Sequence, residues 1–219
     1  MDLQQHSYRV VRFLIYLIAF GVLVVAENPC ASGPPVDTNP AECCPTPMLI
    51  DGSIMMDCYQ KYGEQTKKQL KLDGVPRGCV RKCSKLSNWH ILTFLHLCSH
   101  QCIAECAMNA TNMYADGMLK RDDVSKMFMD AMKDKPEWMA LVRDATNACF
   151  ELAESKKEEI EAGAKLEPSF EGEKICHPIS GVVLRCMGMM MFAQCPSTVF
   201  NGSENCKKLQ EYGSMCPMI

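Results

Sequence analysis

The stretch from Ile175 to Pro196 constrains the fold more than any other part of the chain. Pro178 suits the first turn of a helix, where its missing N–H is not needed. From Ile179 to Ala193 the only strongly polar side chain is Arg185. A helix that is apolar nearly all round is buried inside a domain, and this one, interrupted by two glycines, is too short to span a bilayer. We therefore predict a central helix around which the rest of the chain folds.

The first 26 residues have the three parts of a secretory signal. Arg9 and Arg12 give a positively charged start, Phe13 to Val25 form an apolar run, and the segment ends on the small residue Ala26. The alternative is an N-terminal membrane anchor, but the run is short for one and cleavage is favoured. We expect a secreted, extracellular protein whose mature part, residues 27–219, is a single domain.

All 15 cysteines follow the signal. Cysteines pair in an oxidising compartment, and an odd number leaves at least one over. The formal net charge of −3 argues against nucleic acid or an anionic membrane as a partner. Methionine, with 17 copies, is flexible enough to line adaptable apolar sites as well as cores.

Apolar residues at helical spacing and helix-start signals predict further helices, and no segment alternates convincingly as a strand. The expected helices are Met48 to Tyr62 ending at Gly63, Ile103 to Tyr114, one capped by Asp122, one opened by Pro136 and one capped by Ser203. The fold class is therefore all-α, with about six or more helices.

The cysteine spacing resembles that of the insect odorant-binding proteins. The corresponding residues are Cys102-x3-Cys106, Cys149 and Cys186-x8-Cys195, and the additional Cys43-Cys44-Pro45, Cys176 and Cys195-Pro196 resemble the Plus-C subgroup, with N- and C-terminal extensions. The resemblance covers about residues 40–216. It implies a disulfide-locked helical shell around an apolar cavity that holds odorant- or pheromone-like ligands, and it allows a sensory receptor as a further partner.

The resemblance also implies a disulfide pattern. Cys106 would pair with an upstream cysteine, taken here as Cys58, Cys102 with Cys186, and Cys149 with Cys195. The partners of the remaining framework cysteines stay unassigned; these include Cys176, Cys206 and Cys216.

The candidate ligand-binding residues are apolar side chains on the central helix and on the helices expected to face it. Each could equally be ordinary core, but a Met-rich buried helix suits a site that admits varied apolar ligands. The set is Met113, Met127, Phe128, Trp138, Leu141, Val142, Val183, Met187, Met190 and Met191.

Catalysis and metal binding are not expected. His96, Cys98, His100 and Cys102 form a cluster that could hold zinc, but in an oxidising compartment the sulfurs would form disulfides. A catalytic triad needs a nucleophile, a base and an acid together, and His177 is the only histidine outside the signal and the stretch 84–101. Two other roles are open to His177, namely a capping or solvated role at a helix start and a pH-sensitive contact. We expect no enzyme, cofactor or metal.

Two Asn-x-Ser/Thr sequences are candidate glycosylation sites. Asn201 is the better candidate, because Asn109 lies on a predicted helix beside the cysteines.

Residues 84–101 break the cysteine pattern. Without them and one flanking cysteine, Arg81-Lys82-Cys would continue directly into Ile103 and restore one Cys-x3-Cys pair. We expect an anomalous insert here, of the size of a short intron read in frame; a genuine inserted helix is the alternative.

These features together favour a carrier of small hydrophobic molecules. The alternative is a cysteine-rich interaction or inhibitor protein that acts through its surface.

Overall fold

The computed structural model describes residues 38–71, 101–168 and 170–216, which contain eight helices and one short hairpin. The elements are α2 (Pro40–Cys43), α3 (Gly52–Lys71), α6 (Gln101–Ala110), β1 (Tyr114–Ala115), β2 (Met118–Leu119), α7 (Arg121–Ala131), α8 (Pro136–Ser155), α9 (Lys157–Ala164), α10 (Ile179–Ala193) and α11 (Glu204–Met215). The all-α prediction is confirmed. The predicted signal at 1–26 lies outside the described residues, as does the stretch 84–101 apart from Gln101, which begins α6.

Local sequence signals explain where several helices begin. Pro136 opens α8 and Ile179 follows Pro178 into α10, as predicted. The Ser203 hydroxyl accepts a hydrogen bond from the Cys206 N–H at the start of α11, which is a standard N-cap. Asp122 does not cap α7, because that helix starts one residue earlier. Its carboxylate lies instead in the first turn, where the helix dipole favours negative charge.

Several predicted helix boundaries are wrong, and helix α3 begins at Gly52 rather than at Met48. Helix α3 does not end at Gly63 but continues to Lys71, because a glycine inside a helix costs only about 1 kcal/mol and need not end it. Helix α6 ends at Ala110, and Tyr114 lies in an antiparallel hairpin with β2. The two turn residues, Asp116 and Gly117, have φ of 53° and 80°. Asp-Gly is a favoured pair for such a turn, so this dipeptide was the signal for the hairpin.

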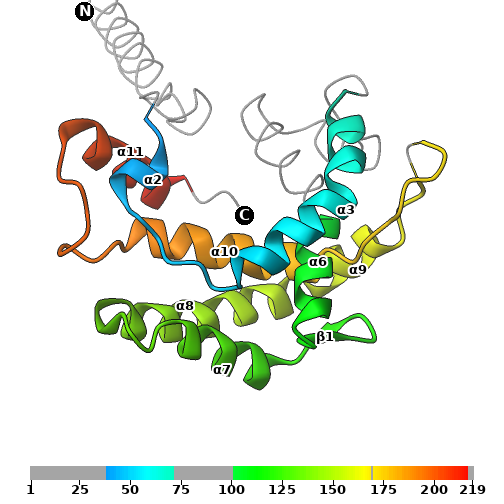
Figure 1. Cartoon of the computed structure of the whole chain (residues 1–219), viewed down its shortest axis with the longest axis horizontal. Helices are drawn as coiled ribbons and strands as arrows, with labels where there is room; N and C mark the ends of the chain where they lie inside the picture. The colour runs from blue at the N-terminus through cyan, green and yellow to red at the C-terminus, as the bar shows by residue number, and fades with distance from the viewer. Residues whose placement is uncertain (1–37, 72–100, 169, 217–219) are drawn as a thin grey trace, which may run out of the picture.

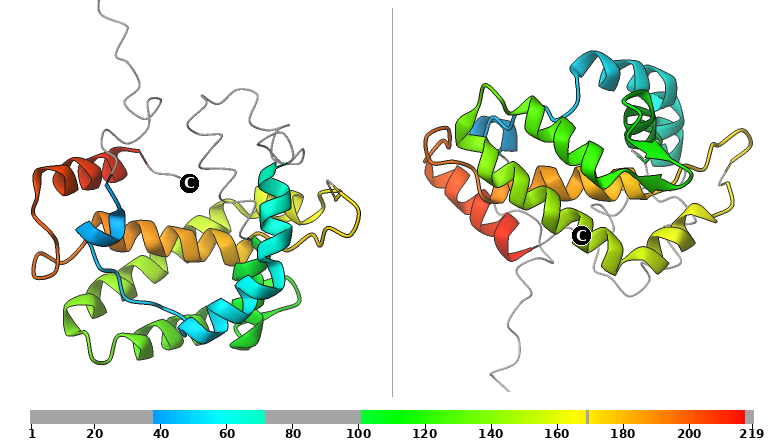
Figure 2. Two further views of the ribbon diagram at one scale, coloured as in Figure 1. Left: turned by 45° about the horizontal axis from the view of Figure 1, so that its top comes forward. Right: turned by 90° about the horizontal axis from the view of Figure 1, so that it is seen from below.

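Helix α10 is the centre of the fold (Figure 1). It packs against α8 along one side, against α6 near its start and against α11 near its end. Helix α3 packs on α6, α7 packs on α8, and α2 lies against α11. Both views in Figure 2 keep α3 beside one end of α10 and α11 beside the other. The prediction that the chain folds around this helix is confirmed.

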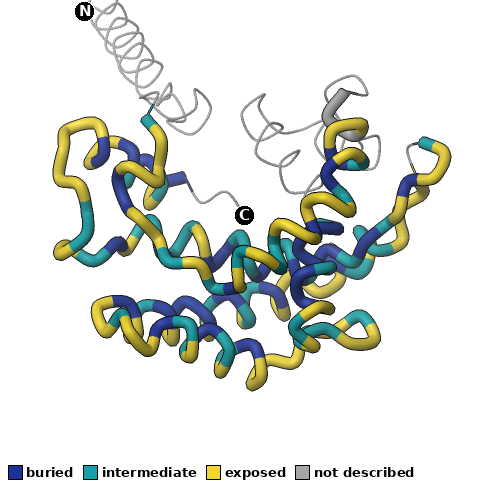
Figure 3. The backbone as a smooth tube through the Cα atoms, viewed as in Figure 1, coloured by how far each residue is buried: buried dark blue, intermediate teal, exposed yellow. Residues whose placement is uncertain are grey.

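The main core lies between α10, α8, α7 and α6, where the buried positions gather in Figure 3. Val183 and Met187 of α10 and Val142 of α8 are 0 % exposed, and Trp138 is 2 % exposed. A second, smaller core of Cys43, Cys206 and Leu209 joins α2 to α11. No helix in the described ranges has the length and apolarity required to cross a membrane.

Five disulfides join these elements within the described residues. They are Cys43–Cys206, Cys44–Cys195, Cys58–Cys106, Cys102–Cys176 and Cys149–Cys186. Cys216 is also disulfide-bonded. The pairing of Cys58 with Cys106 agrees with the family resemblance.

The other two implied pairings are wrong. Cys149 pairs with Cys186 because α8 and α10 lie side by side, with a Cα–Cα distance of 5.6 Å between the two residues. Cys195, at the far end of α10, is 6.1 Å from the Cα of Cys44 and pairs with it. These separations suit a disulfide.

Cys102 is likewise paired differently from the expectation. Its partner is Cys176 in the segment before α10, not Cys186. Cys44 and Cys176, which the implied pairing left without partners, are therefore the partners of Cys195 and Cys102. Because the Cys102 sulfur is in a disulfide, it is not available to the His-Cys cluster considered for zinc; the cluster's other members lie outside the described residues.

Candidate functional site

The ten candidate ligand-binding residues come together in one apolar cluster. They are contributed by the turn after α6 and by α7, α8 and α10, and all belong to the main core or pack against it. Six are buried, namely Phe128, Trp138, Val142, Val183, Met187 and Met191. Four are only partly buried, namely Met113, Met127, Leu141 and Met190.

The cluster is closely packed, and several of its contacts involve methionine or cysteine sulfur atoms. The Thr146 hydroxyl donates a hydrogen bond of 2.6 Å to the Val142 carbonyl and lies 3.7 Å from Met187 Sδ. Met190 Sδ lies 3.8 Å from Cys149 Sγ. Side chains that are 0 % exposed, such as Met187, have no water-sized space beside them. Ligand binding by these ten residues stays a prediction.

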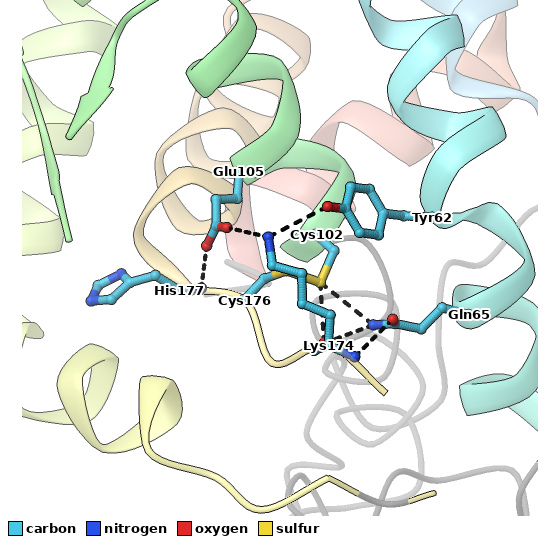
Figure 4. Close-up of a disulfide and its surroundings, with 7 residues drawn as sticks. All are labelled: Tyr62, Gln65, Cys102, Glu105, Lys174, Cys176 and His177. Carbon is cyan, nitrogen blue, oxygen red and sulfur yellow. Dashed lines mark hydrogen bonds and ion pairs between the residues drawn. A yellow bond between two sulfur atoms is a disulfide. The ribbon is translucent and has the colours of Figure 1, made fainter. Parts of the chain in front are cut away.

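A polar group of residues lies at one end of this cluster, around the Cys102–Cys176 disulfide (Figure 4). We call it the polar clamp. Its members come from α3, α6 and the segment that precedes α10, and they are Tyr62, Gln65, Glu105, Lys174 and His177.

Gln65 holds the backbone of the segment before α10. Its side-chain amide donates to the Lys174 carbonyl at 2.8 Å and accepts from the Lys174 N–H at 3.0 Å. These two bonds satisfy both polar groups of one residue in the same way that a neighbouring strand would. Together with the disulfide at Cys176 they attach this segment to α3 and α6.

Glu105 is the most buried charge in the polar clamp, with 7 % exposure. Its carboxylate accepts hydrogen bonds from the Lys174 ammonium at 3.0 Å and from the backbone N–H of His177. The Lys174 ammonium also donates to the Tyr62 hydroxyl at 3.4 Å. Burial by itself lowers the pKa of Lys174, but the hydrogen bond and charge of Glu105 outweigh it and leave that pKa raised. A buried charge is tolerated when it is paired and hydrogen-bonded in this way.

His177 has the capping role that the sequence allowed. Its Nδ1 accepts a hydrogen bond of 3.3 Å from the Ile179 N–H in the first turn of α10. Its Nε2 lies 3.6 Å from Glu161 Oε1 on α9, so that a charged imidazole would form an ion pair there. The pH-sensitive contact stays a prediction.

The polar clamp yields a testable stability effect. Glu105→Gln is expected to lower the free energy of unfolding by about 1–3 kcal/mol, because the Lys174 ammonium and the partly buried His177 N–H then lose their charged acceptor. Urea denaturation at neutral pH followed by circular dichroism measures it. The control is Glu151→Gln on the exposed face of α8, which is expected to stay within about 0.5 kcal/mol of the unmodified protein. If the two substitutions lower the free energy of unfolding equally, Glu105 does not have the stabilising role proposed for it.

Sequence reasoning missed the polar clamp, although one signal was present. Glu105 is an acidic residue between two cysteines on a helix face that is otherwise buried. The sequence predicts that α3 ends at Gly63, and Gln65 was therefore not expected on a helix face or in a site. Its contact with Lys174 joins residues 109 positions apart, which local patterns do not reveal.

The two sequons lie at exposed positions. Asn109 is in the last turn of α6. Asn201 lies in the loop before α11, where its side-chain amide donates to the Glu42 carbonyl at 3.3 Å and its side-chain oxygen accepts from the Ser203 N–H at 3.1 Å. Glycosylation at either residue stays a prediction.

Comparisons with known proteins bear on this arrangement of helices and disulfides. The family model described as AgamOBP47-like matches residues 47–93 and 90–212, two parts that meet within the stretch 84–101. Odorant-binding protein 47 of Anopheles gambiae is 44 % identical over 207 residues, which is 94 % of this chain and 81 % of that protein. Relatives of this identity over most of both chains share a family. The chain therefore belongs to the insect odorant-binding proteins, in the AgamOBP47-like family, and its additional cysteines fit the Plus-C subgroup.

Proposed function

We propose that this protein is a secreted carrier that binds small hydrophobic molecules of the odorant or pheromone type in an extracellular fluid and catalyses no reaction. The observation that carries the proposal is the continuous Met-rich cluster around α10, part of which is accessible from the surface. The name of the Anopheles gambiae relative, an odorant-binding protein, supports the same class of ligand. Disulfides across the helices support an oxidising, extracellular location.

The mechanism of such a carrier is burial of the ligand. A small volatile that loses about 200–300 Å² of apolar surface to the protein gains roughly 5–8 kcal/mol at about 25 cal/mol per Å². Part of this gain is lost because the ligand is immobilised. Dissociation constants from about 1 µM upwards are therefore expected.

The partly buried residues are the expected points of contact. Met190 lies on α10 and Leu141 on α8, and both pack against the main core while staying only partly buried. Met113 and Met127 extend the same apolar border toward α6 and α7. The fully buried members would support this border and adjust their rotamers as ligands of different shape enter.

Binding is tested by substituting one of these residues. Met190→Asp is expected to weaken the binding of N-phenyl-1-naphthylamine at least about tenfold, because the carboxylate would lose water when the probe covers it. Fluorescence titration measures the dissociation constant, and circular dichroism checks that the variant is folded. Met190→Gln, uncharged and of similar size, serves as a second variant in case the charge prevents folding.

The matched control is Met56→Asp on α3, where the methionine is 56 % exposed. It is expected to bind the probe as the unmodified protein does. Unchanged binding in folded Met190→Asp and Met190→Gln would place the site elsewhere. If the unmodified, folded protein binds neither the probe nor any small apolar molecule, the carrier function is wrong and the surface-interaction alternative takes its place.

A further inference from the structure

One stripe of α10 faces the main core and begins with a polar residue. Ser180, Leu184, Met187 and Met191 follow one another at intervals of four, three and four positions, which is the spacing of a single helix face. Met187 and Met191 are buried in the main core, and Leu184 packs against it. The Ser180 hydroxyl therefore lies at one end of the apolar face that the proposed carrier function uses.

The Ser180 side chain is buried without a partner. The residue is 0 % exposed, and its Oγ atom has no hydrogen-bond partner among the described residues. A buried serine or threonine in a helix can donate to the carbonyl four residues earlier, as Thr146 does to Val142 on α8. For Ser180 that residue is Cys176, which lies before α10 begins. The position of Ser180 in the first turn therefore explains why its hydroxyl lacks the usual acceptor.

A buried hydroxyl of this kind destabilises the ligand-free protein. Nearly all buried polar atoms in proteins are hydrogen-bonded, and a donor that is taken from water without a partner loses the free energy of its hydration. A ligand oxygen that accepts from the Ser180 hydroxyl would supply the missing bond. Leu184, one turn further along the same stripe, is only partly buried. We therefore expect a ligand to approach the hydroxyl from the Leu184 side.

We propose that Ser180 forms a hydrogen bond with the uncharged oxygen of a carbonyl or alcohol ligand, whose apolar part lies along Leu184 and Met187. A hydroxyl donates one hydrogen bond and can accept others, so it suits either kind of oxygen. Met187 is buried and would change its rotamer to admit the ligand, as an unbranched side chain can. This inference rests on the proposed carrier function and assigns a polar contact to its ligand.

A negatively charged ligand is not favoured at this position. The Glu105 carboxylate accepts a hydrogen bond from the His177 N–H, so a negative charge already lies at the start of α10. The Lys174 ammonium is paired with that carboxylate. A second carboxylate would be repelled by Glu105 and would lose water among apolar side chains. The expected ligand is therefore a neutral molecule that contains oxygen.

The test uses three ligands with the same carbon skeleton, namely 4-phenylbutan-2-one, butylbenzene and 4-phenylbutanoate. Displacement of N-phenyl-1-naphthylamine at pH 7.4 gives their dissociation constants. The unmodified protein is expected to bind the acid more weakly than the ketone. Ser180→Ala is expected to weaken the binding of the ketone about 3- to 10-fold, which is the effect of one neutral hydrogen bond, and to change that of butylbenzene less than about twofold. Ser180→Cys, of similar size but with a weaker donor, is a second variant and is expected to weaken the binding of the ketone likewise.

Urea denaturation of the ligand-free protein separates this role from a structural one. Because Ser180→Ala removes a hydroxyl that lacks a partner, it is expected to raise the urea midpoint while it weakens the binding of the ketone. The matched control is Ser155→Ala on α8, an exposed serine whose hydroxyl donates to the Leu152 carbonyl at 2.7 Å. This variant is expected to keep the midpoint and all three dissociation constants close to those of the unmodified protein.

A lower urea midpoint for Ser180→Ala would mean that the hydroxyl stabilises the ligand-free protein, and the inference would be wrong. It would also be wrong if Ser180→Ala leaves ketone binding unchanged or weakens ketone and butylbenzene equally, if the acid binds more tightly than the ketone, or if the probe binds but no ligand displaces it. In all these cases the carrier function stands. If the folded, unmodified protein binds neither the probe nor any of the three ligands, the carrier function fails together with this inference.

Discussion

Replacing Trp138 with alanine is expected to lower the free energy of unfolding by about 3–5 kcal/mol. Trp138 is 2 % exposed and fills the core between α8 and its neighbours. Removing the indole loses the apolar surface it buries and leaves a cavity that the surrounding helices can close only in part. A domain of this size has a total stability of roughly 5–15 kcal/mol, so the variant is expected to be near the limit of folding.

Urea denaturation followed by far-ultraviolet circular dichroism measures this change. Met139→Ala is the control on the same helix, because Met139 is next to Trp138 in sequence but 38 % exposed; it should cost less than about 1 kcal/mol. The stability loss of Trp138→Phe is expected to lie between those of Trp138→Ala and Met139→Ala. A loss below about 1 kcal/mol for Trp138→Ala would mean that this side chain is not part of a closely packed core.

Removing the Cys149–Cys186 bridge by changing both residues to serine is expected to cost about 2–5 kcal/mol. The bridge joins the two helices that pack most extensively, and it closes a sequence separation of 37 residues. The physical reason is that cross-linking removes conformations from the unfolded chain, and both serines would in addition be buried where the sulfurs now lie. The same urea experiment measures the effect.

The pairing itself is checked by peptide mapping of the unmodified protein under non-reducing conditions. A peptide with Cys149 joined to Cys186 is expected, together with one that joins Cys44 to Cys195. Recovery of Cys149 joined to Cys195 would match the pairing that the family resemblance implies and would contradict the arrangement of the helices in the structure. The Cys58–Cys106 pair, which both the resemblance and the structure contain, is the internal control.

The central helix could be predicted from the sequence because its signals are local. A proline at its start and a nearly uninterrupted apolar composition identify α10 whatever the rest of the chain does. The same holds for Pro136 at the start of α8 and for Ser203 before α11. Most of the candidate apolar residues were likewise recognisable from their spacing along these helices. Their gathering in one cluster follows from the way amphipathic helices bury their apolar faces.

What the sequence by itself determined about this protein is therefore its helical class, its main helix starts and the set of cysteines available for pairing. Only the tertiary structure decided which cysteines pair, because a disulfide needs Cα atoms about 4–7 Å apart, and the neighbours of Cys102, Cys149 and Cys195 depend on how the helices pack. The polar clamp was decided in the same way, since Gln65 and Glu105 meet Lys174 across 109 and 69 positions of sequence.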